Sequence, residues 1–279
     1  MPNILSKKWL ELREFLKKFI LLRLLVRFAW KFFSRPLRFF TGFFSLLVEA
    51  ISGRRQVISR REATFFGDHI ATTHFVQFLH DSKFIHSYHD AFQNIPDHVK
   101  DPIKSLDISW RAHICTWAAT QALTLEGDFV ECGVWYGILS RTMCSYVDFN
   151  QLERKFYLFD TWGEQAGSHS SYKDDIFAVV KSRFSDFNNV HLVRGLVPDV
   201  LDKVKIEKIA YLSIDMNGSI AERLTLERFY EKVVPGGIIY FDDYGWEYPE
   251  LRKTVDAFFS DKPESLLHFP SGNSIIVKL

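Results

Sequence analysis

The sequence predicts an α/β fold built on a mostly parallel sheet, and two patterns indicate it. Apolar runs typical of buried strands recur after residue 125, and most of the gaps between them carry a helical pattern. Strands that alternate with helices form parallel sheets with right-handed crossovers. The expected strands are Phe129–Trp135, Phe156–Phe159, Val190–Val193, Ile209–Ile214 and Ile238–Phe241.

Composition and charge divide the chain into three expected parts. With 279 residues, 47% of them hydrophobic, it can bury one large core and carry an appendage. Residues 1–61 hold fourteen Lys and Arg against three Glu, whereas the remainder is net acidic. We expect a basic helical leader over 1–61, a helical cap region over 62–125 and the sheet domain over 126–279. The three cysteines lack paired spacing, which favours a reducing, cytoplasmic compartment.

The leader predicts an amphipathic helix up to Ser34 with a narrow cationic face that includes Arg23, Arg27 and Lys31. Charged residues interrupt it too often for a membrane span. Two interpretations remain open. Residues 9–51 lie on an anionic membrane surface, at the inner face of the cytoplasmic membrane, or the helix packs on its own domain or on a second subunit of a homodimer. No pattern indicates a nucleic-acid partner.

From Arg61 to Leu125 the pattern is helical, with expected breaks at "QNIPDH" and "KDPIKS". The clearest helix is "SWRAHICTWAATQAL", in which apolar residues recur three and four positions apart. It contains His113, which we interpret as a packing residue rather than a catalytic one.

Polar residues and glycines stand where the expected parallel strands end, and ligands of parallel sheets bind at that edge. The first strand closes in Glu131 and Gly133, while Gly137 opens the next helix. Glycines there let backbone approach a ligand closely and leave room for it. The other strand ends are marked by Asp160, by Arg194, by Asp215, and by Asp242 with Asp243.

The glycine spacing favours one class of cofactor. "GVWYG" departs from G-x-G-x-x-G, and its Trp135 and Tyr136 would crowd a pyrophosphate. S-adenosylmethionine brings no phosphate, and the carboxylate of Asp160 stands where a ribose could donate both hydroxyls. A nicotinamide dehydrogenase is therefore disfavoured.

Six motifs together resemble one family, in order and at the expected separations. They are "EGDFVECGVWYG", "KFYLFDTWG", "VRGLVPDVL", "KIAYLSIDMN", "VPGGIIYFDDYGW" and "FPSGNSIIVKL". They look like the TylF/MycF/NovP-related class I O-methyltransferases, and the likeness covers about residues 62–279. The resemblance implies a seven-stranded methyltransferase sheet with helices on both faces and a final antiparallel hairpin at Leu266–Phe269 and Ser274–Lys278.

The resemblance also implies methyl transfer from S-adenosylmethionine to a hydroxyl, usually on a sugar or another natural-product scaffold and often assisted by Mg²⁺. Glu131, Gly133, Gly137 and Asp160 match the family's cofactor loop and ribose acid, and we add Arg194 to the expected cofactor residues. Asp215, Asp242 and Asp243 match the carboxylates that hold the metal, and three carboxylates form a hard oxygen site suited to Mg²⁺. The alternative is that Asp242 and Asp243 cap a helix or solvate a loop.

One motif departs from the family. Its sugar methyltransferases commonly read D-G-D after the fourth strand, and the second acid is a candidate general base, whereas this chain reads "DMN". Asn217 cannot accept a proton. The catalytic candidates are Asp215 itself and His169 in the loop "TWGEQAGSHSSY", with metal activation alone as a third route. The alternative function is a catalytically weak, cofactor-binding or partner-binding member tethered at a membrane.

Overall fold

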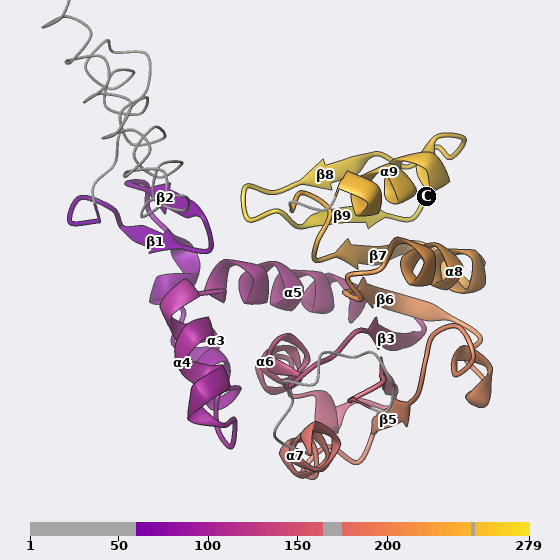
Figure 1. Ribbon diagram of the computed structural model, residues 1–279, viewed down its shortest axis with the longest axis horizontal. Coiled ribbons are helices and arrows are strands. Elements are labelled where there is room, and N and C mark those ends of the chain that lie inside the picture. Colours follow the sequence, from indigo (N-terminus) through magenta and orange to yellow (C-terminus); the bar gives the residue numbers. More distant parts are fainter. Residues whose placement is uncertain (1–59, 164–174, 247–248) are drawn as a thin grey trace, which may run out of the picture. The chain divides into compact units, whose positions relative to one another are not determined.

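The computed structural model describes residues 60–163, 175–246 and 249–279 (Figure 1). The expected leader, except for its last two residues, lies outside this part of the chain. So does the loop residue His169. Neither the proposed membrane contact of the leader nor the role of His169 is therefore tested by the fold, and both stay predictions.

A seven-stranded sheet forms the centre of the domain, in the order β5-β4-β3-β6-β7-β9-β8. The first five strands in chain order, β3 to β7, pair in parallel, and β9 runs antiparallel to both β7 and β8. This confirms the predicted class I methyltransferase-like sheet and its final hairpin. The bounds are β3 Asp128–Cys132, β4 Phe156–Asp160, β5 Val190–Arg194, β6 Ile209–Ile214, β7 Val233–Phe241, β8 Leu266–His268 and β9 Ser274–Val277.

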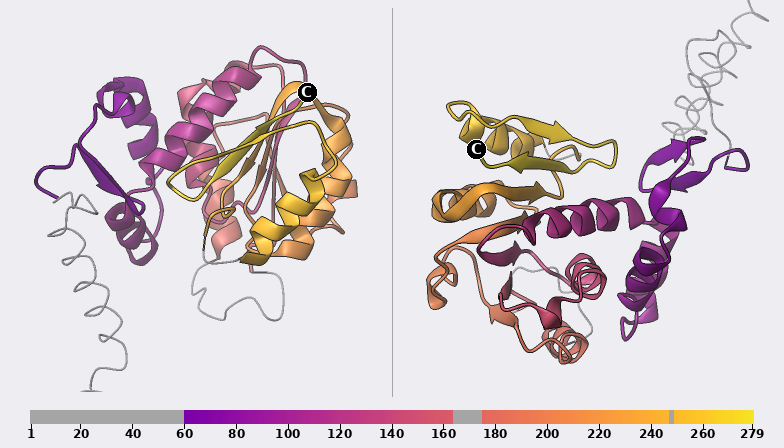
Figure 2. Two further views of the ribbon diagram at one scale, coloured as in Figure 1. Left: turned by 90° about the horizontal axis from the view of Figure 1, so that it is seen from above. Right: turned by 180° about the vertical axis from the view of Figure 1, so that it is seen from behind.

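Helices cover both faces of the sheet (Figures 1 and 2). α5 (Ser109–Ala122), α6 (Ile138–Tyr146) and α7 (Ile176–Arg183) pack on one face, and α8 (Ser219–Phe229) and α9 (Pro249–Phe259) pack on the other. Alternate residues of each strand enter the two cores, so that Phe129 belongs to the first and Val130 to the second. Short 3₁₀ helices lie at Gln77–His80, Phe149–Gln151, Leu201–Lys203 and Tyr230–Lys232.

The region before α5 is less uniformly helical than its pattern predicts. A small antiparallel hairpin, β1 (Phe65–Gly67) and β2 (Ile70–Thr72), precedes α3 (Ser82–Asp90) and α4 (Asp97–Leu106). The prediction of helix was wrong at this hairpin because three-residue strands are too short to show an alternating pattern. The expected break at "KDPIKS" was also wrong, since α4 continues through Pro102.

α5 begins and ends close to its prediction. His113 stacks on Phe78, with ring centroids 4.8 Å apart, and burial lowers its pKa. This geometry agrees with a packing histidine. Of the residues that the structure describes, none belong to a helix with the length and apolarity needed to cross a bilayer.

The sheet order places the candidate site. Successive strands run outward from β3 to β4 and β5 on one side, and the chain then returns to add β6 and β7 on the other. The crevice above the carboxyl ends of β3 and β6 is therefore a topological switch point, where open α/β sheets bind their ligands.

Candidate active site

Gly133 follows β3, and its surroundings explain why no other residue fits. Its φ is +90°, and a Cβ built there would lie 1.6 Å from the carbonyl oxygen of Asp215. The close neighbour is thus the backbone at the end of β6, whereas the sequence suggested a ligand. Gly133 lets two strand ends of the switch point approach each other.

Asp160, at the end of β4, holds the turn after β3. Its Oδ2 accepts the backbone N–H groups of Val134 and Trp135, each at 2.7 Å, and its Oδ1 accepts that of Trp162 at 2.8 Å. Trp162 also donates its indole N–H to the Trp135 carbonyl, at 2.8 Å. A carboxylate oxygen has room for two hydrogen bonds, so Oδ1 retains acceptor capacity while it fixes the loop.

A cavity of 580 Å³ lies beside this loop. Its lining includes Gly133, Asp160, Asp215 and, from β5's end, Gly195. Three further lining residues, Trp135, Trp162 and Asn217, have positive φ although none is glycine. Such backbone strain concentrates at binding and catalytic sites, where surrounding structure keeps it in place. The sequence analysis did not single out Trp162, Met216 or Leu196, which supply apolar surface to the cavity.

The remaining expected cofactor residues lie outside the lining of this cavity. Glu131 is buried within β3, and burial raises its pKa to about 8, with the charges of Asp242 and Asp160 adding to the effect. A Cβ on Gly137 would lie 2.7 Å from the Phe184 ring. Arg194 directs its guanidinium toward the carbonyl oxygens of Thr161 and Trp162, at 3.3 and 3.4 Å. The arginine therefore supports lining residues of the cavity.

Asp215, Asp242 and Asp243 come together, and we call them the acid cluster. One carboxylate oxygen from each lies within 4.8 Å of the others. The Oδ2 atom of Asp243 is buried and has no hydrogen-bond partner among the described residues. Two neighbouring strand ends, those of β6 and β7, supply all three side chains.

Crowding raises the pKa values of two members of the acid cluster, Asp215 and Asp243. Asp215 is only partly buried as a residue, but its enclosed carboxyl group has a pKa well above the usual range because of burial and the charges of Asp242 and Asp243. Burial and the charge of Asp242 raise the pKa of Asp243 to about 7. Carboxylates in this arrangement favour a bound proton or cation, since either relieves their repulsion.

Asp242 has three side-chain partners that the sequence analysis did not identify. Arg111 of α5 donates to its Oδ2 at 2.5 Å, Tyr240 donates to its Oδ1 at 2.6 Å, and Asn273 donates to the same Oδ1 at 3.2 Å. Arg111 also binds both carboxylate oxygens of Asp68. These contacts hold Asp242 in place and argue against a role for it as a solvated loop residue.

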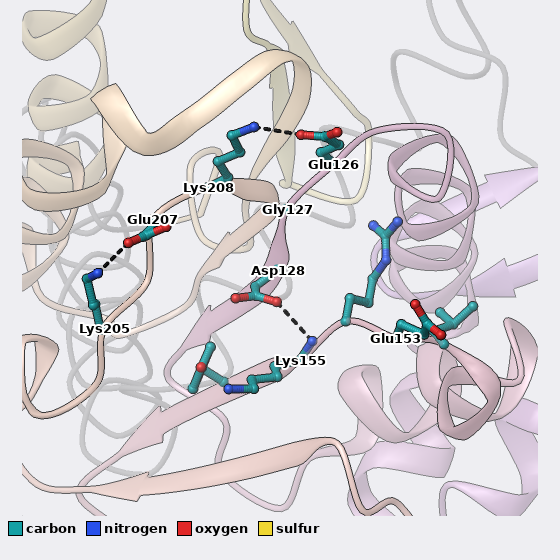
Figure 3. A pocket seen from close by; sticks show the side chains of 11 residues that line it. Glu126, Gly127, Asp128, Glu153, Lys155, Lys205, Glu207 and Lys208 are labelled. Carbon is teal, nitrogen blue, oxygen red and sulfur yellow. Dashed lines mark hydrogen bonds and ion pairs between the residues drawn. The ribbon is translucent and has the colours of Figure 1, made fainter.

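A second hollow, of 490 Å³, lies at the opposite edge of the sheet (Figure 3). Its charges pair with one another, since Lys208 binds Glu126 at 2.6 Å and Lys205 binds Glu207 at 2.5 Å. It adjoins the amino ends of β3 and β4, where Asp128 accepts the N–H of Lys155. Because parallel sheets bind ligands at their carboxyl ends, this hollow is the weaker candidate.

A match to a protein-family model identifies the family of this chain. The model of the TylF family, described as macrocin-O-methyltransferase, matches residues 115–264. The chain belongs to the TylF family. It is accordingly an S-adenosylmethionine-dependent O-methyltransferase. The match includes all three acids of the acid cluster and the turn after β3, but not Asp68, Arg111 or Asn273.

Solved structures agree with this TylF-family fold. The O-methyltransferase NovP is 21% identical, with a TM-score of 0.51, and the match covers 60% of this chain and 79% of that one. The methyltransferase PaMTH1 of Podospora anserina, with bound S-adenosylhomocysteine (SAH), is 12% identical over 71% and 88% of the two chains, with a TM-score of 0.50. At these identities the likeness concerns the fold. No match was found among curated proteins.

Proposed function

We propose that this TylF-family enzyme binds S-adenosylmethionine in the 580 Å³ cavity and methylates a hydroxyl of a sugar-like acceptor beside the acid cluster. One observation carries the proposal. Asp215 both lines the cavity and belongs to the acid cluster, so the methyl donor and the acids would be neighbours. The family resemblance supports the acceptor class.

The cavity suits the cofactor. Its volume falls within the range of about 300 to 1,000 Å³ that small-molecule sites occupy. Asp160 offers Oδ1 to ribose hydroxyls, while Trp135, Trp162 and Met216 offer apolar surface to the nucleoside. Glu131, Gly137 and Arg194 would act from behind the lining, by supporting the strand ends and the turn that carry it.

The acid cluster suits Mg²⁺. Hard oxygen donors converge from Asp215, Asp242 and Asp243, and Asp243 keeps a buried oxygen without a partner among the described residues. A bound Mg²⁺ would supply a Lewis acid that lowers the pKa of the acceptor hydroxyl. The protein's own part is to orient that hydroxyl toward the methyl group and to exclude water from it.

Among the described candidates, Asp215 is the residue that would accept the proton of the acceptor hydroxyl. Asn217 lines the cavity but has no basic atom. Asp215 lines the cavity, so its carboxylate, when deprotonated, can accept the proton of a hydroxyl bound there. His169 remains the alternative predicted from the sequence.

Titration calorimetry tests the proposal. S-Adenosylmethionine should bind and NAD should not, with or without Mg²⁺. Replacing Asp160 by Ala should weaken cofactor binding by about 1.5 to 3 kcal/mol, because a charged acceptor and the clamp on the turn are both lost. Asp128→Ala is the matched control, since Asp128 accepts a backbone N–H at the other edge of the sheet. Unchanged affinity in a folded Asp160→Ala protein would refute the assignment.

A further inference from the structure

Arg111 lies between two carboxylates in the protein interior. Its Nε and Nη2 donate to the two oxygens of Asp68 at 2.7 and 2.8 Å, and its Nη1 donates to Asp242 at 2.5 Å. The side chain is 9% exposed, that of Asp68 is 0% exposed and that of Asp242 is 6% exposed. The guanidinium also lies 4.7 Å from the Trp246 ring centroid. A permanent positive charge is therefore fixed against one member of the acid cluster.

The hairpin β1–β2 holds this arginine from the far side. Asp68 and His69 form its turn, with φ values of +45° and +63° that residues other than glycine rarely adopt. The backbone N–H of Asp68 donates to the Leu106 carbonyl at 2.6 Å, which fixes the turn to the end of α4. The strained turn presents a bidentate carboxylate to Arg111, so the guanidinium cannot turn away from Asp242 without losing two buried charged hydrogen bonds.

We propose that Arg111 is a positioning residue that acts as a built-in counter-cation of the acid cluster. It keeps Asp242 beside Asp215 and Asp243 when no metal ion is bound, and its charge weakens the binding of a divalent cation there. The proposal rests on the Mg²⁺ site of the proposed function. It makes Mg²⁺ an exchangeable partner of a site that the protein has already assembled.

The direction in which Mg²⁺ affinity changes when Arg111 is removed distinguishes this role from a merely structural one. If Arg111 only joined the hairpin to the sheet, removing it would lower stability and leave Mg²⁺ affinity unchanged or weaker. If it is a counter-cation, its removal eliminates repulsion between two buried positive charges a few Å apart, which is a strong interaction even at an effective dielectric constant of about 20. Tyr240 and Asn273 still hold Asp242 when Arg111 is removed, so Mg²⁺ then binds more tightly.

The decisive variant is Asp68→Asn with Arg111→Gln, which removes the buried pair together and so leaves no carboxylate at position 68 without its arginine. Mg²⁺ is titrated by calorimetry into the full chain, and the melting temperature is followed with and without Mg²⁺. We expect at least about tenfold tighter Mg²⁺ binding than in the wild type and a larger rise in melting temperature on adding Mg²⁺. Should this variant not fold, Asp68→Asn with Arg111→Met, which keeps an apolar stem against Trp246, carries the same expectation.

Three control variants separate the effect of the positive charge of Arg111 from other effects of mutation. Asp68→Asn alone removes a buried negative charge and keeps Arg111 against Asp242, so it should weaken Mg²⁺ binding, the opposite of the double variant. Arg141→Gln removes another arginine that binds two aspartates, Asp90 and Asp186, and should leave Mg²⁺ affinity within about threefold of the wild type. Arg111→Lys restores the charge without the bidentate geometry and should return the affinity toward that of the wild type.

Unchanged or weaker Mg²⁺ binding in the folded double variant overturns the proposal, as does the absence of Mg²⁺ binding in every protein. Titration of the same proteins with S-adenosylmethionine distinguishes a failure of the Arg111 proposal from a failure of the proposed function. Cofactor binding that persists leaves the proposed methyl transfer standing even if the role of Arg111 is wrong.

Discussion

Glu131 is an acid that the protein keeps almost entirely out of water. Its Oε2 atom has no hydrogen-bond partner within the described part of the chain, and burial raises its pKa from 4.5 to about 8. The folded protein therefore holds a proton on Glu131 that the unfolded chain releases near pH 4.5. The stability linked to this proton is fully present below pH 4.5 and is lost as the pH rises to about 8.

Replacing Glu131 by Gln should remove this pH dependence. Relative to the wild type, the variant should gain up to about 4 kcal/mol in the free energy of unfolding between pH 5 and pH 9, because a neutral amide has no proton to lose. Urea unfolding at the two pH values, without ligand, measures the difference. Glu126→Gln is the control, since Glu126 is exposed and paired with Lys208. Parallel pH profiles for Glu131→Gln and the wild type would contradict the prediction.

The residues around Asp242 show which parts of a site a sequence can reveal. Asp242 itself was predictable because it ends an apolar strand run that is visible within five residues. Its partners Arg111 and Asn273 are 131 and 31 residues away, and neither ends a parallel strand. Only the folded chain brings them together. The turn after β3 was predictable for the same reason as Asp242, although the neighbour that requires Gly133 belongs to β6.

At the scale of elements, the side chain of Arg183 links α7 to the turn after β3 and to the segment that follows α3. This buried side chain at the end of α7 donates to the carbonyl oxygens of Tyr136 in the turn after β3, of Ala91 after α3, and of Gln93. Burial lowers its pKa to about 10. The turn after β3 and the segment that follows α3 are thus held by one guanidinium.

Arg183→Met should lower the free energy of unfolding by about 3 kcal/mol or more, because buried carbonyl groups lose charged donors. It should also weaken S-adenosylmethionine binding, because the turn that carries Tyr136 loses its support. Denaturant unfolding and calorimetry measure the two effects. Arg228→Met, at an exposed pair with Asp202, should change stability by no more than about 0.5 kcal/mol. Equal stabilities of the two variants would show that Arg183 has no such role.

Element boundaries differ from their predictions for local reasons. The first expected strand extended to Trp135, but β3 ends at Cys132 because Gly133 adopts a left-handed φ. β7 begins at Val233, five residues before its expected start, through a Pro-Gly-Gly stretch that local patterns do not read as strand. The parallel strands themselves were predictable because strands buried on both faces are continuous apolar runs.

At the scale of the whole molecule, the basic leader lies entirely outside the residues that the family model matches. Its amphipathic pattern predicts that the full chain sediments with vesicles containing anionic lipid, with each basic side chain near the surface contributing about 1 kcal/mol. High salt should weaken this binding without abolishing it, since apolar contacts remain. Vesicle sedimentation over a salt series measures both effects.

Two variants sharpen that experiment. A chain that begins at Glu62 should stay in the supernatant and still bind S-adenosylmethionine. Replacing Arg23, Arg27 and Lys31 by Gln should weaken sedimentation while it leaves cofactor binding unchanged. Full-length protein that stays in the supernatant as a dimer, with its leader protected from protease, would instead identify the leader as a protein interface.

The strand order divides the site between two sets of strands. Asp160 and Arg194, on β4 and β5, lie on one side of β3, whereas the acid cluster directly follows β6 and β7 and Asn273 directly precedes β9 on the other. Substitutions in the β8–β9 hairpin or in the turn of β1–β2 should therefore change the surroundings of the acids and leave unaltered the hydrogen bonds that Asp160 makes to the turn after β3.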